Sequence, residues 1–345
     1  MTGSGDLRPP EPPGSDPPGP DQPSPSARPG LRIFSLDGRH APGLYLVGWL
    51  ASLLGASTIL VVFLGQPSDL AGAILLGLGT LLLATGLAAA AGSQAIERQA
   101  AGNLGYRGPS PFILLGATVA LTLFIELIAF VPLGALGVRA GSPAEALSGL
   151  LILNGSALLL VAVFVVGTGA LGWREMGVPG RTPGGGFMIA GPFRNLLEGM
   201  IVGVPILLLT AVLGAVLVGL LGVTPASPLP AAQTPADAAI NLVSGVLIAP
   251  LGEELFYRGF ATTAWVRGLG PRAGILRGAL LFALAHVLTL SGTPPAALIA
   301  FVTRLPVALA LGWIFVRRGS LASSFGLHAM FNAIPLILVG LSLGG

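Results

Sequence analysis

The stretch LLEGMIVGVPILLLTAVLGAVLVGLLG, residues 196–222, carries a single charged side chain, Glu198. A helix needs about 20 apolar residues to cross the hydrocarbon core of a bilayer, so this stretch is long enough to span a membrane. Comparable apolar runs follow one another from residue 43 onward. The sequence therefore predicts an all-α fold, a polytopic transmembrane helical bundle of about nine spans.

The spans are expected at residues 43–65, 70–92, 112–136, 149–171, 196–222, 236–257, 275–290, 295–316 and 321–343. The seventh run is short, which suits a tilted or partly re-entrant segment. Gly and Pro are frequent inside the runs, and lipid-embedded helices tolerate both residues better than soluble helices do.

The composition supports this interpretation and removes several kinds of chemistry. Hydrophobic residues make up 53% of the chain and charged residues 9%, against roughly a quarter charged in soluble domains. The absence of cysteine excludes disulfides, thiolate metal sites and cysteine nucleophiles. All basic residues are arginines, which excludes lysine Schiff-base chemistry. The arginines are scattered and the net charge is only +3, so we expect no nucleic-acid partner.

Residues 1–40 differ from the rest of the chain. Ten of the 30 prolines precede position 31, mixed with Gly, Ser and Asp. Such a segment has too little apolar surface to fold, so we expect a disordered tail and no signal peptide. Residues 41–235 are then N-terminal transmembrane helices, and residues 236–345 form a C-terminal core.

The distribution of arginine predicts the orientation. With nine spans, one side of the membrane holds Arg8, Arg28, Arg32, Arg39, Arg98, Arg107, Arg174, Arg181, Arg194, Arg267, Arg272, Arg317 and Arg318. The loops on the other side hold Arg139 alone. Because cytoplasmic loops are enriched in basic residues, we expect a multi-pass protein of the cell (inner) membrane with a cytoplasmic N-terminus and an external C-terminus.

Several ionisable side chains fall at membrane depth, where a charge costs several kcal/mol. They are Glu126, Glu253, Glu254, His286, Arg304 and His328. Glu126 is interpreted as a protonated acid bonded to a neighbouring helix. Arg304 could mark a broken helix start or pair with Glu126, and the sequence leaves both open.

The remaining residues form a pattern. Glu254 and Arg258 are four residues apart on one helix, as are Phe282 and His286, and His328 and Asn332. Side chains four apart share a helix face, so each pair can act together.

Glu253, beside Glu254, is turned about 100° away and can point into a cavity. At 1.5 Å per residue, Glu253, His286 and His328 would lie about 8, 15 and 10 Å below the cytoplasmic surface. We therefore expect one site, opening to the cytoplasmic side.

Such a site could hydrolyse an amide with water and no covalent intermediate. Arg258 would hold Glu254 as a carboxylate and leave Glu253 as a general base toward water. His286 could orient that water or ligate a metal, and His328 and Asn332 could donate hydrogen bonds to an oxyanion. The sequence has no His-Glu-x-x-His, no Gly-x-Ser-x-Gly and no paired intramembrane aspartates.

At these residues the sequence resembles the CPBP family, also called the Abi or CAAX-protease-like family, which includes the Rce1-type prenyl endopeptidases. The family pattern is Glu-Glu-x-x-x-Arg, Phe-x-x-x-His and His-x-x-x-Asn on successive helices, and all three motifs are complete here. The stretch Arg317-Arg318-Gly319-Ser320-Leu321 also resembles the lead-in to the third motif. The resemblance covers roughly residues 236–340 and implies that 236–345 is a catalytic core.

The resemblance implies an intramembrane endopeptidase, a peptide-bond hydrolase. It assigns Glu253 to water activation, His286 to positioning that water, and His328 and Asn332 to the oxyanion, with Glu254 and Arg258 as support. The family is commonly called metalloproteases. Glu253, His286 and His328 could hold Zn²⁺, while a metal-free site stays open.

The expected partners are the lipid bilayer and a membrane-associated peptide or protein substrate. The lysine-free composition resembles that of a bacterial protein, so we do not predict a prenylated CAAX substrate. A non-catalytic membrane scaffold or bacteriocin-immunity-type protein, and a proton-coupled transporter, remain as alternatives.

Overall fold

The computed structural model of this chain describes residues 35–102, 104–179, 190–288 and 292–343. The predicted disorder of the tail concerns residues that lie almost entirely outside this part of the chain. Every helix of the described residues lies within the unit Arg39–Gly345. Throughout the described ranges the regular structure is helical, so the predicted all-α fold is confirmed.

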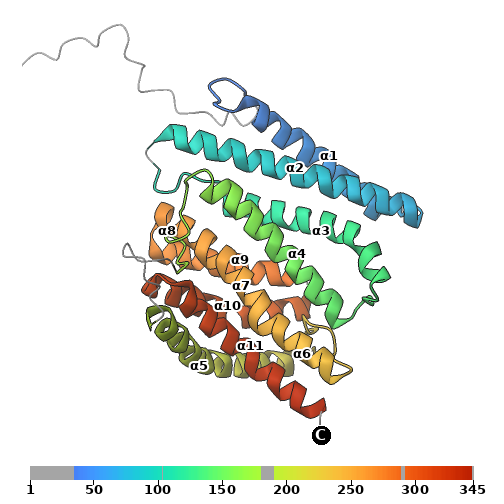
Figure 1. Cartoon of the computed structure of the whole chain (residues 1–345), viewed down its shortest axis with the longest axis vertical. Coiled ribbons are helices and arrows are strands. Elements are labelled where there is room, and N and C mark those ends of the chain that lie inside the picture. The colour runs from blue at the N-terminus through green and yellow to red at the C-terminus, as the bar shows by residue number, and fades with distance from the viewer. Residues whose placement is uncertain (1–34, 103, 180–189, 289–291, 344–345) are drawn as a thin grey trace, which may run out of the picture. The chain divides into compact units, whose positions relative to one another are not determined.

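Five helices make up the N-terminal part of the bundle (Figure 1). They are α1 (Pro42–Gly65), α2 (Asp69–Ala101), α3 (Pro111–Ala135), α4 (Pro143–Val161, continued by the π-helical η1, Ala162–Val166) and α5 (Ala190–Leu221).

The C-terminal part begins with one long helix that changes its winding. It consists of α6 (Pro235–Val243), η2 (Ser244–Ile248), α7 (Ala249–Glu253), η3 (Glu254–Thr262) and α8 (Thr263–Leu269), of which η2 and η3 are π-helical. It is followed by α9 (Pro271–Leu288), α10 (Pro294–Arg318) and α11 (Leu321–Leu343).

Eight helices within the described residues are long and apolar enough to cross a membrane. The long helix Pro235–Leu269 counts as one of them. The seventh predicted span falls on α9, which is not among the eight and carries Arg272 and Arg277 in its first half. The chain is therefore a multi-pass membrane protein.

Proline sets the start of many of these helices. It occupies one of the first two positions of α1, α3, α4, α6 and α10, where its missing N–H would have no partner in any case. At α6 the Thr234 side chain also accepts from the Asp237 amide, and the Asp237 carboxylate accepts from the Thr234 amide. This capping box satisfies two end groups of the helix that leads to the site.

Glycines allow α1 and α2 to approach closely. A Cβ on Gly55 would overlap the backbone of Leu83, and a Cβ on Gly86 would overlap that of Ser52. Small residues at contact positions are what membrane helices use to pack, because lipid gives no hydrophobic drive between helices. Gly79 makes a further contact of this kind, against Ile59.

The long helix α6–α8 lies at the centre of the C-terminal part. It contacts α4 from the N-terminal part and also α9, α10 and α11, while α5 packs against α10 and α11. The first four helices are neighbours in sequence order, α1 to α2, α2 to α3 and α3 to α4. Side chains placed midway along the long helix are consequently enclosed by helices from both parts of the chain (Figure 1).

Two ion pairs join segments at one end of the bundle. Arg267 Nη2 lies 2.6 Å from Glu175 Oε1, and Arg318 pairs with Glu198. The amide of Leu321 donates to the carbonyl of Gly177 at 3.0 Å. The segments so joined are among those for which the sequence predicts a cytoplasmic location.

Candidate active site

The first motif lies where the long helix changes its winding. Glu253 is the last residue of α7, and Glu254 and Arg258 lie in η3. The hydroxyls of Thr262 and Thr263 donate to the carbonyls five residues earlier, Tyr257 and Arg258. Such π-helical turns are rare and occur frequently at functional sites.

Glu254 and Arg258 form a buried ion pair. Arg258 Nη1 donates to Glu254 Oε1 at 3.0 Å, and each residue is about 1% exposed. His328, from α11, places its Nδ1 2.8 Å from the same carboxylate oxygen. Because a buried charge is costly without a partner, this three-residue network explains how the carboxylate is tolerated.

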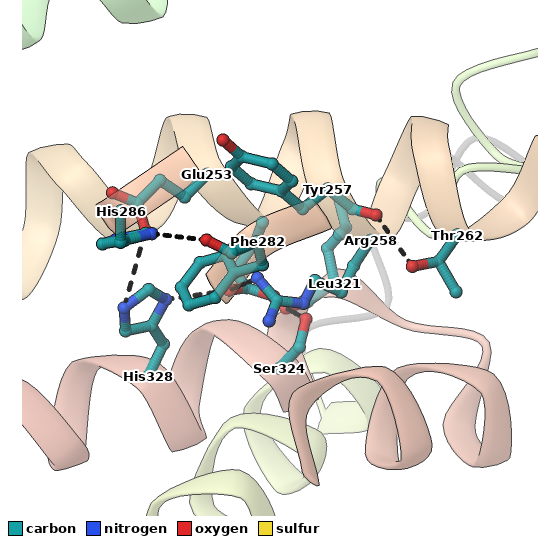
Figure 2. A network of polar contacts seen from close by, with 10 residues as sticks. Glu253, Tyr257, Arg258, Thr262, Phe282, His286, Leu321, Ser324 and His328 are labelled. Atoms are coloured by element: carbon teal, nitrogen blue, oxygen red, sulfur yellow. Dashed lines mark hydrogen bonds and ion pairs between the residues drawn. The ribbon is translucent and has the colours of Figure 1, made fainter. Parts of the chain in front are cut away.

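Phe282 is the platform on which the cluster is assembled (Figure 2). Its ring centroid lies 4.2 Å from the guanidinium carbon of Arg258 and 4.2 Å from the His286 ring. The rings of His328 and Tyr257 lie 5.8 and 5.2 Å away. One aromatic side chain thus contacts the cation by a cation–π interaction, the His286 ring in a tilted geometry and the His328 ring edge-on.

His286 and His328 both turn Nε2 toward Glu253. His286 Nδ1 lies 2.8 Å from the Phe282 carbonyl, which can only accept, so Nδ1 carries the proton. In each histidine, Nε2 lies 3.7 Å from Glu253 Oε2. Figure 2 shows the three side chains turned toward one another.

Glu253 and His286 face each other because α8 and α9 form a hairpin at Gly270. Glu253 precedes Gly270 by 17 residues and His286 follows it by 16, so antiparallel packing brings them to one level. Gly270 has φ 85°, a conformation that glycine adopts at no steric cost. The predicted meeting of Glu253, His286 and His328 side chains is what the structure contains.

The predicted end of the sixth helix is wrong. The sixth span was expected to end at about residue 257, just after the motif glutamates, but the helix continues to Leu269. Glu253 therefore lies about 24 Å along the helix from that end, at 1.5 Å per residue. Continued π-helical pairing past Arg258, which a periodicity of 3.6 does not reveal, carries the helix onward.

Asn332 and Arg304 lie at the edge of this cluster. Asn332 donates through Nδ2 to the Gly245 carbonyl at 2.8 Å, so one of its two N–H groups is used within the protein. Arg304 donates to the Ala300 carbonyl of its own helix at 3.2 Å and interacts electrostatically with Glu253 and His286. Helix α10 runs unbroken through this region, so Arg304 does not mark a helix start.

Glu126 lies in the other half of the bundle. A Cβ on Gly149 of α4 would come within 2.9 Å of Glu126 Oε1, and Glu145 acts on Glu126 electrostatically. Arg304 acts instead on Glu253 and His286, so the alternative in which Glu126 pairs with Arg304 is not what the structure contains.

Metal binding needs a set of ligands at coordinating distances. Glu253, His286 and His328 are the residues of the expected set, and imidazole and carboxylate are suitable donors for zinc. Within the described part of the chain, however, no group of three or more His, Cys, Asp or Glu side chains has the arrangement that a bound metal ion requires. We therefore derive no chemical step through a metal.

One residue near the cluster was absent from the sequence interpretation. Asn154 of α4 donates through Nδ2 to the Ile248 carbonyl at 2.6 Å, one turn before Glu253. A signal for it was available in Gly252, because a glycine beside the motif indicates close approach of another helix.

The comparisons with known proteins agree with the motifs. Residues 235–334 match the family model described as type II CAAX prenyl endopeptidase Rce1-like. Neither a curated protein nor a solved structure shows significant similarity to the chain. The matched segment begins with α6 and ends within α11, so it contains the whole Glu253 cluster. By this match and its three complete motifs, residues 235–334 are similar to the CPBP, or CAAX-protease-like, family.

Proposed function

We propose that this protein is an intramembrane endopeptidase, in which Glu253 activates a water molecule to hydrolyse peptide bonds of membrane-associated peptides or proteins. One observation carries the proposal. Glu253 Oε2 is buried, has no hydrogen-bond partner among the described residues, and faces two imidazole nitrogens at 3.7 Å each. A buried carboxylate oxygen left unpaired in this way is costly, and such groups occur where a ligand or water is handled.

The distances suit a shared water. A separation of 3.7 Å is too long for a direct hydrogen bond, and polar groups at such distances are commonly bridged by water. His286 holds its proton on Nδ1, so its Nε2 accepts a hydrogen bond from that water. Glu253 accepts the other water hydrogen and is the general base.

The reaction then follows in two proton transfers. The water oxygen attacks the carbonyl carbon of the scissile peptide while Glu253 takes one water proton, which gives a tetrahedral intermediate. Glu253 returns that proton to the amide nitrogen as the carbon–nitrogen bond breaks. The products are a new carboxylic acid, which keeps the second water proton until it ionises, and a new amine, and no covalent enzyme intermediate forms.

The oxyanion of that intermediate needs hydrogen-bond donors. His328, held through Nδ1 by Glu254, can donate from Nε2 when its ring carries a second proton. Asn332 retains one N–H beyond the one bound to Gly245. Preorganised donors of this kind are each worth about 10²–10³ in turnover.

Arg258 and Glu254 act through His328 rather than on the substrate. Their pairing fixes the carboxylate that orients the imidazole, and both are fully enclosed. This division leaves Glu253 as the carboxylate available for proton transfer, and Arg304 interacts with it electrostatically.

The orientation belongs to the same proposal: the N-terminus is cytoplasmic, the C-terminus external, and the site opens toward the cytoplasm of a bacterial cell membrane. The natural chain has no cysteine, so single substitutions give clean labels. We expect Arg107→Cys and Arg139→Cys to react with impermeant thiol reagents from opposite sides of the membrane. Labelling of both from the same side would contradict this topology.

The function is tested by comparing membrane proteomes and their newly formed peptide ends. Cells with the wild-type protein should contain cleaved fragments that are absent with Glu253→Gln. Glu126→Gln is the matched control, because it also neutralises a glutamate at membrane depth but lies outside the cluster. If biological activity persists in Glu253→Gln, the protein acts without this chemistry, as a scaffold would.

A further inference from the structure

Two asparagine side chains hold the backbone just before Glu253. Asn332 of α11 donates to the Gly245 carbonyl at 2.8 Å, and Asn154 of α4 donates to the Ile248 carbonyl at 2.6 Å. Both carbonyls belong to η2, the π-helical turn that leads into α7 and Glu253. The two amides reach this turn from different parts of the bundle.

Pro250 explains why η2 needs a hydrogen-bond donor from another helix. In η2 the amide of Ala249 donates to the Ser244 carbonyl, five residues earlier. The next bond in this register would run from residue 250 to the Gly245 carbonyl, but proline has no N–H to donate. Asn332 Nδ2 takes the place of that missing donor. An unpaired carbonyl at membrane depth would otherwise cost several kcal/mol.

Gly252 makes the contact of Asn154 possible. A Cβ built on Gly252 would overlap the side-chain amide of Asn154, and the three atoms nearest to it all belong to that residue. Asn154 therefore occupies the space that any side chain at position 252 would fill. The position directly before the catalytic pair is a glycine because α4 is inserted there.

We propose that Asn154 is a positioning residue for Glu253, and that with Asn332 it forms a clamp on η2. This inference rests on the proposed function, since it concerns how the general base is aimed. Holding the carbonyls of Gly245 and Ile248, eight and five residues before Glu253, fixes the rotation of the helix about its axis. That rotation decides whether Oε2 faces His286 and His328, and a displacement of about 1 Å can cost 10²-fold in rate.

The clamp gives the N-terminal helices a part in catalysis. Asn154 lies in α4, outside residues 235–334 that match the family model. The family segment supplies Asn332 and the reactive side chains, whereas the second half of the clamp is supplied by a helix outside it. A protein lacking α4 would keep the three complete motifs but would lose the Asn154 contact that orients Glu253.

The first set of variants distinguishes the effect of the Asn154 N–H donor from the effect of the shape of its side chain. Asn154→Ala removes the amide, and Asn154→Asp keeps the shape but replaces the N–H donors with carboxylate oxygens. We expect turnover to fall at least 10-fold for Asn154→Ala and further for Asn154→Asp, with KM within about twofold of wild type. Ser156→Ala is the matched control, because this buried hydroxyl on the same helix has no partner within the described residues.

The second set uses the steric relation between Asn154 and Gly252. Gly252→Ala should reduce turnover at least as much as Asn154→Ala, because the new methyl group must displace the amide. In the Asn154→Ala background the same Gly252→Ala change should cost little more, because the overlap is gone. Such non-additivity is the signature of a direct interaction.

Hydrogen exchange of residues 244–253 in the full-length protein supplies a readout that does not need cleavage. Exchange in this segment should be faster in Asn154→Ala and unchanged in Ser156→Ala. The clamp is overturned if Asn154→Ala keeps wild-type turnover or if the two substitutions are additive. In that case wild type still cleaves and Glu253→Gln does not. Absence of cleavage in the wild type overturns the proposed function and, with it, the catalytic role of the clamp.

Discussion

His328 Nδ1 lies 2.8 Å from Glu254 Oε1, which ties the third motif of the chain to the first. Because Arg258 binds the same oxygen at 3.0 Å, the histidine is oriented by a carboxylate that is itself fixed. The arrangement leaves Nε2 of His328 facing Glu253. The three motifs, which are separate in the sequence, thus form one connected network in the structure.

Arg258→Gln should be among the most destabilising substitutions in the chain. It leaves Glu254 as a buried charge without its ion-pair partner, which typically costs about 3–5 kcal/mol. The free energy of unfolding in detergent, measured by denaturant titration, checks this. Arg107→Gln removes an exposed arginine and should change that free energy by less than about 0.5 kcal/mol. Equal stability of the two variants would show that the buried pair is not structural.

Phe282→Leu should lower both stability and activity. The ring contacts the guanidinium of Arg258 and both imidazoles, and leucine is apolar but smaller and has no ring face. Loss of a desolvated cation–π contact is worth about 2 kcal/mol, and the histidines lose their platform. Cleavage rate and unfolding free energy are the measurements.

Phe130→Leu is the control for that substitution, because this ring is 62% exposed on a membrane helix. It should leave both measurements close to wild type. If Phe282→Leu behaves like Phe130→Leu, the aromatic platform does not organise the site.

Much of this could be predicted from the sequence, for specific reasons. Apolar runs near 20 residues define helices in lipid, so the all-helical bundle followed directly. The spacing of four in Glu254–Arg258 and Phe282–His286 survives in the structure, because an i to i+4 contact is local. The meeting of His286 and His328 with Glu253 could be predicted because the three motifs together resemble one family pattern.

The remainder depends on contacts that spacing does not encode. The long helix continues past residue 257 through the π-helical η3 and ends at Leu269, before Gly270 with its φ of 85°. Asn332 is satisfied by Gly245 because Pro250 leaves that carbonyl without a donor. Both effects depend on which turns of the helix are π-helical. Neither changes the hydrophobic pattern of the sequence, so neither could be predicted from that pattern.

Metal removal gives a direct check of the water mechanism. Since Glu253, His286 and His328 do not make a metal-coordinating group, we expect hydrolysis by the purified protein to survive prolonged treatment with a strong chelator. Cleavage rates before and after dialysis against chelator are compared. Loss of activity, restored by added Zn²⁺, would show that a metal assembles these ligands in the working enzyme.

The ion pair Glu175–Arg267 predicts a weak pH dependence of stability. The hydrogen bond from Arg267 holds the pKa of the Glu175 carboxyl below its ordinary value of 4.5. A lowered carboxyl pKa stabilises the folded state above the ordinary value, and the contribution is lost as the pH falls through the lowered one. Glu175 is largely exposed, so the gain is at most about 1 kcal/mol.

Arg267→Gln should abolish this contribution. The wild type should lose more thermal stability than the variant between pH 7 and a pH well below 4.5. Parallel pH profiles for the two proteins would show that this surface pair does not contribute.

The central claim is that Glu253 is the general base of the converged cluster. The most direct measurement is the cleavage rate of a substrate peptide by purified wild-type, Glu253→Gln and Glu126→Gln proteins of matched stability. We expect Glu253→Gln to cleave at least 10³-fold more slowly than wild type and Glu126→Gln to cleave within about threefold of it. Cleavage by Glu253→Gln at the wild-type rate would contradict the claim.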